Sequence, residues 1–143
     1  MLDSKFFFFI APEIVSRYRK HIFFDGKDID GKSFKSYSKE YSKRKRGNKF
    51  KRQASQFKNS TSPVLTSDLL RDFKMQKQPS SKGFTFGTTS WGVKVEALKK
   101  LGRNLYRGNK VLPTEVSRYF EKEAKKYTEK KLKLKFKGGT FKI

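Results

Sequence analysis

The strongest chemical signal in the sequence is a dense run of cations in the middle of the chain. Residues 32–58 hold eleven Lys or Arg and a single acid. Such a density of like charge repels itself inside a packed element, so it predicts either a solvated loop that aids solubility or a surface that faces a polyanion. The polyanion would be nucleic acid or an acidic protein. The cations expected to face it are Lys43, Arg44, Lys45, Arg46, Lys49, Lys51 and Arg52.

The acidic residues offer no comparable site. Asp25, Asp28 and Asp30 are spaced like part of a calcium loop, but the glycine and the distal glutamate of such a loop are missing, which favours a plain acidic turn. Glu121 and Glu123 lie two positions apart on an expected helix, so they point in different directions and do not share a metal ion. We therefore expect no enzyme, no catalytic residue, no metal ion and no cofactor. A small metal nuclease is the least unfavourable enzymatic alternative.

Composition limits the remaining classes. The chain has 143 residues, a formal net charge of +23, one histidine and no cysteine, which excludes disulfides and cysteine-ligated metal sites. An apolar fraction of 34% would suggest disorder, but 15 Phe, 6 Tyr and 1 Trp can build a core from few positions. The longest apolar run, residues 6–11, is far shorter than a membrane span, so we expect no membrane partner. The prediction is one soluble domain over residues 1–143.

The pattern of apolar residues indicates which elements must position these groups. The run Phe6–Ile10 has the length of a strand covered on both faces, and Pro12 then opens a helix that ends at Phe24, with His21 on its polar side. Lys131–Lys137 alternates between lysine and apolar residues, which predicts a strand with one all-lysine face. Between them we expect a turn at 28–31, a basic insertion at about 43–62, a short helix at 68–73, a hairpin around the loop 79–83, a helix from 91 to Gly102 and a helix opened by Pro113.

The sum of these elements is an α+β fold. We expect one layer of mostly antiparallel sheet packed against two or three helices. The fold also includes a basic central loop or helix and a basic C-terminal strand. This strand belongs to a lysine-rich tail at 131–143.

The order of short motifs resembles a known family, the phage virion-morphogenesis (tail-completion) proteins of the Mu type. These are related to tail-terminator and head–tail joining proteins, and the likeness spans about residues 12–120. It consists of an amphipathic first helix followed by Gly31-Lys32-Ser33-Phe34, basic residues 37–46, leucine-rich residues 65–70, Gly87-Thr88, Trp91-Gly92, a helix ending at Gly102, and Leu112-Pro113. The family usually has Tyr-Ala at Trp91-Gly92. The positions that carry the resemblance are Gly31, Phe34, Leu69, Gly87, Trp91, Gly102 and Pro113.

The resemblance implies a structural virion protein, made in the host cytoplasm, that forms a ring at the head–tail junction and joins the connector to the tail. Its partners would be copies of itself, other connector and tail proteins, and packaged DNA through nonspecific phosphate contacts. Subunits of a ring contact one another heterologously, and we expect strand addition between the two terminal segments. The alternative is that both segments are internal strands of one sheet. The expected contact residues are Phe6, Phe7, Phe8, Phe9, Leu132, Leu134 and Phe136.

A nonspecific nucleic-acid-binding protein is the second hypothesis. Aromatic residues are interleaved with the cations of the basic region, so the cations would hold phosphates while the rings stack on bases. No helix–turn–helix spacing, RNA-recognition motif or zinc finger is present in the sequence, so base-specific reading has no support. The aromatic residues concerned are Phe34, Tyr37, Tyr41, Phe50 and Phe57.

Overall fold

The computed structural model describes residues 2–40, 43, 68–90, 92–106 and 109–137. Its helices are α1 (Ser4–Arg19), the π-helical turn η1 (Lys20–Phe24), α4 (Asp68–Asp72), α5 (Gly92–Lys100) and α6 (Thr114–Lys137). The strands β1 (Lys74–Ser80) and β2 (Gly83–Gly87) form an antiparallel two-stranded sheet. The fold is α+β, as the sequence predicts, and helices hold most of the described residues.

Helix α1 begins near the start of the chain because Asp3 caps it. The Asp3 carboxylate accepts a hydrogen bond from the backbone N–H of Phe6 at 3.1 Å. Buried apolar residues then recur every four positions from Phe6 to Tyr18, which gives the helix one continuous apolar face. The strand expected at 6–10 is therefore wrong. A short apolar run fits a buried helix as well as a strand, and the cap and the longer periodicity decide for the helix.

The helix ends where the sequence predicts, at Phe24. Its last turn is widened, because the backbone N–H of Asp25 donates to the carbonyl of Lys20 at 2.9 Å, five residues back. Gly26 follows with a φ of 65°, a conformation that favours glycine, and turns the chain away. The widened turn places three successive side chains in the core, namely His21, Ile22 and Phe23.

The predicted hairpin is confirmed, with a tighter turn than expected. Met75 pairs with Phe86 and Ser80 pairs with Gly83, so two residues rather than five connect the strands. Gly83 has a φ of 132°, which explains why a glycine follows this turn.

Helix α6 begins directly after the buried Pro113, as predicted, and its 24 residues span about 36 Å. The strand expected at Lys131–Lys137 is wrong, because these residues are the last turns of α6. Lysine, leucine and glutamate are strong helix formers, and neither glycine nor proline interrupts the sequence from Thr114 to Lys137. A helix also spreads the lysines around its surface instead of aligning them on one face.

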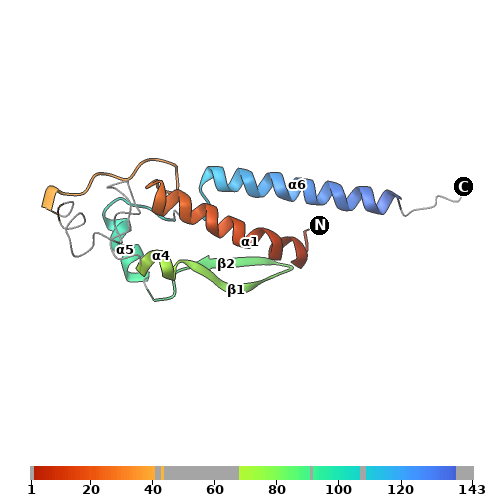
Figure 1. The fold of residues 1–143 in the computed structure, drawn as a ribbon, viewed down its shortest axis with the longest axis horizontal. Helices are drawn as coiled ribbons and strands as arrows, with labels where there is room; N and C mark the ends of the chain where they lie inside the picture. Colours follow the sequence, from red (N-terminus) through yellow and green to blue (C-terminus); the bar gives the residue numbers. More distant parts are fainter. Residues whose placement is uncertain (1, 41–42, 44–67, 91, 107–108, 138–143) are drawn as a thin grey trace, which may run out of the picture.

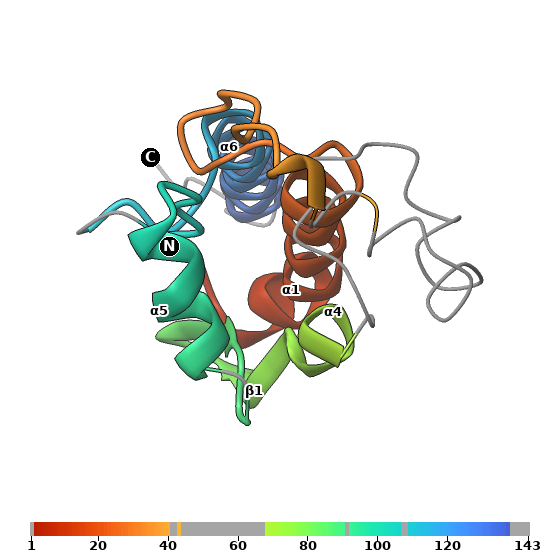
Figure 2. The same cartoon turned by 90° about the vertical axis from the view of Figure 1, so that its left-hand side faces the viewer.

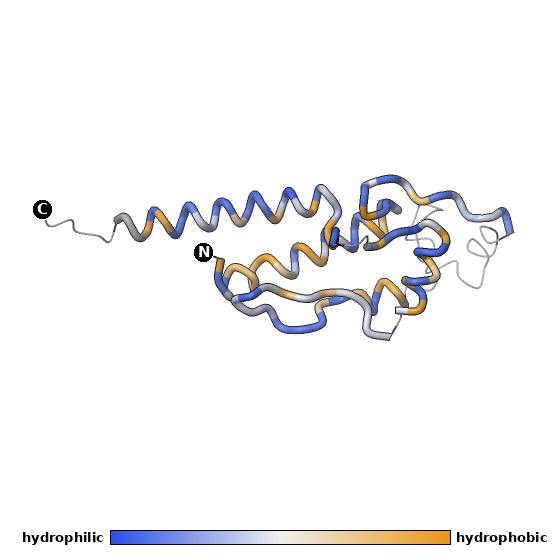
Figure 3. Tube along the Cα trace, turned by 180° about the vertical axis from the view of Figure 1, so that it is seen from behind, coloured by the Kyte–Doolittle hydropathy of each residue, from blue (hydrophilic) through white to orange (hydrophobic). Residues whose placement is uncertain are grey.

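Helix α1 lies between the hairpin and α6 (Figure 1). On the hairpin side, the rings of Tyr18 and Phe73 stack with their centroids 4.8 Å apart, and α4 lies beside the hairpin, away from α6 (Figure 2). On the α6 side, Phe6 contacts Phe120 and Tyr127 at centroid distances of 5.8 and 5.1 Å. Figure 3 shows α1 as largely hydrophobic and α6 as largely hydrophilic. Helix α1 is therefore the element around which the rest packs.

Candidate interaction site

Four large apolar side chains are exposed at one end of the molecule. Phe8 and Phe9 lie on the outward side of α1 with exposed fractions of 52% and 72%. Leu132 and Leu134 lie on α6 with exposed fractions of 49% and 62%, where the helix extends beyond the start of α1 (Figure 1). We call these four residues the apolar end.

The other residues expected to contact partners have different surroundings. Phe6 is 2% exposed and belongs to the core, and Phe7 is half-buried beside Phe84 with a centroid distance of 6.4 Å. The side chain of Phe136 lies outside the described residues. Strand addition is wrong as the contact mode of these segments, because a helix uses its backbone N–H and C=O groups internally and offers no strand edge.

Asp3 joins the two helices that form the apolar end. Tyr127 of α6 donates its hydroxyl to Asp3 Oδ1 at 2.8 Å, and Lys131 Nζ forms an ion pair with Asp3 Oδ2. Lys131, the backbone N–H of Phe6 and the Tyr127 hydroxyl hold the pKa of the Asp3 carboxyl well below its usual range. The hydrogen bond to Asp3 in turn raises the pKa of Lys131. These contacts place the last turns of α6 beside the N-terminus of α1.

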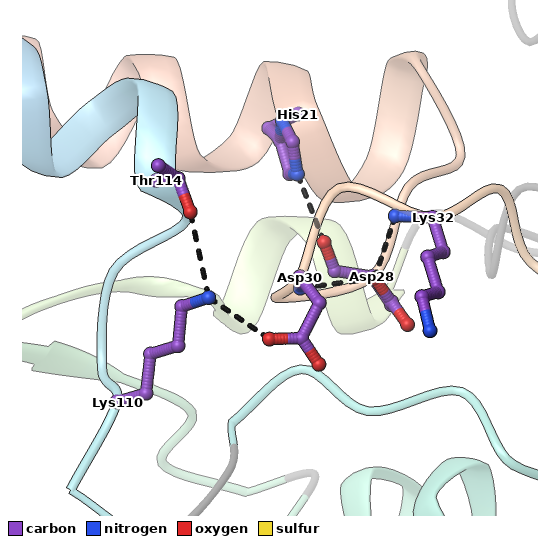
Figure 4. A network of polar contacts seen from close by, with 6 residues as sticks. All are labelled: His21, Asp28, Asp30, Lys32, Lys110 and Thr114. Carbon is purple, nitrogen blue, oxygen red and sulfur yellow. Dashed lines mark hydrogen bonds and ion pairs between the residues drawn. The ribbon is translucent and has the colours of Figure 1, made fainter.

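A second polar network fixes the acidic turn at 28–31 against the helices (Figure 4). His21 Nε2 donates to the backbone carbonyl of Asp28 at 2.9 Å, and the Asp28 carboxylate accepts two backbone N–H groups of its own turn at 2.9 and 2.8 Å. Lys110 Nζ lies 2.9 Å from Asp30 Oδ1 and 3.4 Å from Thr114 Oγ1, which ties the turn to the start of α6. The predicted acidic turn is confirmed.

The polar position expected for His21 is wrong, because its side chain is 4% exposed. Ile10, Ile14 and His21 are spaced by four and seven residues and therefore lie on one helical face. This spacing is the sequence signal for the burial of His21, and its part from Ile14 to His21 already lies within the helix expected from Pro12.

Six of the seven positions that carry the family resemblance are described, and all six have structural roles. Gly31 and Gly102 adopt φ angles of 84° and 73° at the ends of a turn and of α5, and Gly87 has a φ of 155°. A Cβ at Gly87 would lie 3.6 Å from the hydroxyl of Tyr106. The side chains of Phe34, Leu69 and Pro113 are buried, and Trp91 lies outside the described residues. These residues determine turns and core packing, so they bear on the fold rather than on chemistry.

The basic block lies mostly outside the described residues. Lys43 is described and exposed, whereas Arg44, Lys45, Arg46, Lys49, Lys51 and Arg52 lie outside them. The exposed cations of the described residues are spread over several elements, and those on the later turns of α6 are Lys122, Lys125, Lys126, Lys130 and Lys133.

The aromatic residues proposed to stack on bases are only partly accessible. Phe34 is 4% exposed and belongs to the core, so its expected stacking role is wrong. Tyr37 is covered on one face by the guanidinium of Arg103, whose Cζ lies 3.9 Å from the ring centroid. Nothing in the spacing around Arg103 signals that its side chain is buried and donates to the carbonyl of Lys35. Tyr41, Phe50 and Phe57 lie outside the described residues.

The described residues hold neither a cluster of metal ligands nor a helix that could span a membrane. No three His, Asp or Glu side chains among them are gathered as a metal site. None of the helices in the described part of the chain is long and apolar enough to cross a membrane.

Comparison with known proteins adds no relative. No family model, no curated protein and no solved structure matches the chain.

Proposed function

We propose that the chain is a structural, non-enzymatic subunit that assembles with copies of itself into a ring. We propose further that this ring belongs to the head–tail junction of a tailed phage virion, where it joins the connector to the tail. The place in the virion rests on the resemblance of the motifs from Gly31 to Pro113.

The observation that carries self-assembly is the apolar end. Exposed apolar residues are common on soluble proteins, and further examples in this chain are Phe24, Val93, Leu101 and Val111. What supports a contact surface at the apolar end is that its four side chains lie at the same end of two neighbouring helices. Phe8 and Phe9 come from one helix and Leu132 and Leu134 from another, and the Asp3 contacts hold the two helices together. Exposed apolar residues on two different helices of one subunit suit the heterologous contacts that close a ring.

Net charge controls when the apolar ends can meet. A subunit of +23 repels its copies at low ionic strength, and the exposed Lys130 and Lys133 lie within one turn of Leu132 on α6. Salt shortens the range of that repulsion, and a polyanion neutralises it. Assembly should therefore be favoured by moderately high salt or by a polyanion such as DNA.

The nucleic-acid-binding alternative is supported by the same exposed lysines. These lysines favour phosphate contacts, which weaken steeply as salt rises. The alternative has no use for the apolar end, and Phe34 is not free to stack on bases. We therefore favour the ring.

Substitution of Phe9 tests the proposal. Phe9→Ser removes an apolar contact without changing net charge, and Val93→Ser is the matched control, because Val93 is 84% exposed on α5, away from the apolar end. We expect the wild type and Val93→Ser to form rings in electron micrographs at about 0.5 M salt, and Phe9→Ser to remain monomeric. Assembly of Phe9→Ser like that of the wild type would contradict the proposal.

A further inference from the structure

A groove follows the outward side of α1 where this helix meets β1. It has a volume of about 790 Å³. Its apolar lining comes from Pro12 and Val15 of α1, Phe24 of η1 and Met75 of β1. From Pro12 to Phe24 the lining follows the helix over about 18 Å, which is the length of about three helical turns. An elongated apolar trough of this length fits a helix that lies along it.

The edges of the groove carry only positive charge. Arg19, Lys20 and Lys74 contribute to its lining, and no acidic residue does. Among the described residues, none of these three cations forms an ion pair, and Arg19 donates to the backbone carbonyl of Leu70 at 3.1 Å. The groove therefore combines an apolar floor with an uncompensated positive rim.

The chain itself is a poor source of the complementary charge. Residues 41–67 and 138–143 contain no Asp or Glu. The whole chain carries 13 acids against 36 Lys or Arg, so a second copy brings mainly repulsion. An occupant that matches the rim must come from a different, acidic protein.

We propose that this groove binds an acidic amphipathic helix of another protein. Apolar side chains of that helix lie on Pro12, Val15 and Met75, and its flanking carboxylates pair with Lys20 and Lys74. The assignment goes beyond the proposed ring, because it concerns a partner other than a copy of this chain. The residues that line the groove are also different from those of the apolar end, although Phe8 precedes Pro12 by one turn on the same face of α1.

Nucleic acid fits the groove less well than an acidic helix does. Phosphates would suit the rim, but Phe24 brings the one ring in this lining on which a base can stack, whereas Pro12, Val15 and Met75 are not aromatic. An amphipathic helix uses both the rim and the floor, because its carboxylates and its apolar side chains occupy different faces.

Fluorescence anisotropy with the full chain and designed probes tests the proposal. The first probe is a labelled helical peptide of about 18 residues with leucines at helical spacing on one face and glutamates elsewhere. The second probe has serine at each leucine position and the same charge. The third is a single-stranded DNA oligonucleotide with the same number of negative charges.

Two double variants with the same net charge distinguish binding in the groove from general electrostatic attraction to the protein. Lys20→Glu with Lys74→Glu reverses two rim charges, whereas Lys99→Glu with Lys100→Glu reverses two exposed charges on α5. We expect the first pair to weaken binding of the leucine peptide at least about tenfold and the second pair to weaken it less than about threefold. The serine peptide should bind at least about tenfold more weakly than the leucine peptide to the wild type.

Three results would overturn the proposal. The first is equal binding of the leucine and serine peptides, and the second is equal weakening of binding by the two double variants. The third is that DNA displaces the leucine peptide and that the Lys20 and Lys74 substitutions weaken DNA binding as much as they weaken peptide binding. If the rim variant does not fold, Met75→Ser decides, because it alters the floor and leaves every charge in place. Phe9→Ser should bind the leucine peptide like the wild type, so failure of the ring and failure of the groove are distinguishable.

Discussion

Asp3 is the residue that connects the start of the chain to its last helix. Its carboxylate caps α1 through the N–H of Phe6 and accepts hydrogen bonds from Tyr127 and Lys131 of α6. One side chain thus begins the central helix and also aligns the two helices that carry the apolar end. Because its folded-state pKa is lowered, the contribution of Asp3 to stability depends on pH.

Asp3→Ser should change how stability depends on pH. The contribution of the ionised carboxylate is complete above the unfolded-state pKa of about 3.9 and is lost as the pH falls from there toward the lower folded-state pKa. Between about pH 5 and pH 2.5 we expect the free energy of unfolding to fall more steeply in the wild type than in Asp3→Ser. Serine keeps the cap, so the difference isolates the charge. Urea unfolding measures it, and equal slopes would contradict the account.

Tyr18→Phe tests the buried hydrogen bond at the centre of the core. The Tyr18 hydroxyl donates to the carbonyl of Leu105 at 2.5 Å, and burial raises the pKa of this tyrosine. Removing the hydroxyl leaves a buried carbonyl without its donor, so we expect a loss of about 1–3 kcal/mol in the free energy of unfolding. Tyr119→Phe is the control, because Tyr119 is half-buried beneath Arg17, and a change within about 0.5 kcal/mol is expected there. Equal losses in the two variants would argue against this hydrogen bond.

At the scale of elements, the sequence predicts those whose signals are local. The helix end near Gly26, the hairpin, the helix that stops at Gly102 and the helix after Pro113 all follow from glycine, proline and apolar spacing. The strands expected at 6–10 and 131–137 are wrong. A short apolar run fits a buried helix as well as a strand, and a short alternation of lysine and apolar residues fits an exposed helix as well as a strand. The Asp3 cap and the longer apolar periodicity favour a helix at the first segment, and the uninterrupted helix formers of α6 favour one at the second. The contacts of Asp3 with residues of α6 add a long-range contribution.

The candidate site follows the same division. The sequence predicts that the phenylalanines near the N-terminus include contact residues. It does not show that Phe6 is buried in the core and that Phe9 is exposed. That distinction needs the helical assignment and the position of α6. The burial of His21 and of Arg103 likewise depends on packing against segments far away in sequence.

Lys133→Pro tests the helical end of α6. Proline removes a backbone N–H and clashes with the preceding turn, so it should end the helix near this position. We expect weaker helical far-ultraviolet circular dichroism than in Lys133→Ala and loss of ring assembly. The thermal midpoint should stay within about 2 °C of the control, because Leu132, Lys133 and Leu134 are exposed. Unchanged circular dichroism would contradict a helix in this segment.

At the scale of the whole molecule, two opposing features determine association. The apolar end, formed by residues of α1 and of the last turns of α6, favours contact between copies, whereas a net charge of +23 opposes it. The balance changes with ionic strength, since the screening length falls from about 10 Å at 0.1 M salt to about 3 Å at 1 M. A protein that binds only nucleic acid has the opposite response, because salt weakens its interactions.

Sedimentation velocity of the free protein across a salt series tests this balance most directly. The account predicts a 16.8 kDa monomer at about 0.05 M salt and a single larger species of defined mass at about 0.5 M, which electron microscopy shows as a ring. It also predicts the larger species at low salt when DNA is added. A protein that stays monomeric at every salt concentration and only loses DNA as salt rises would contradict the central claim.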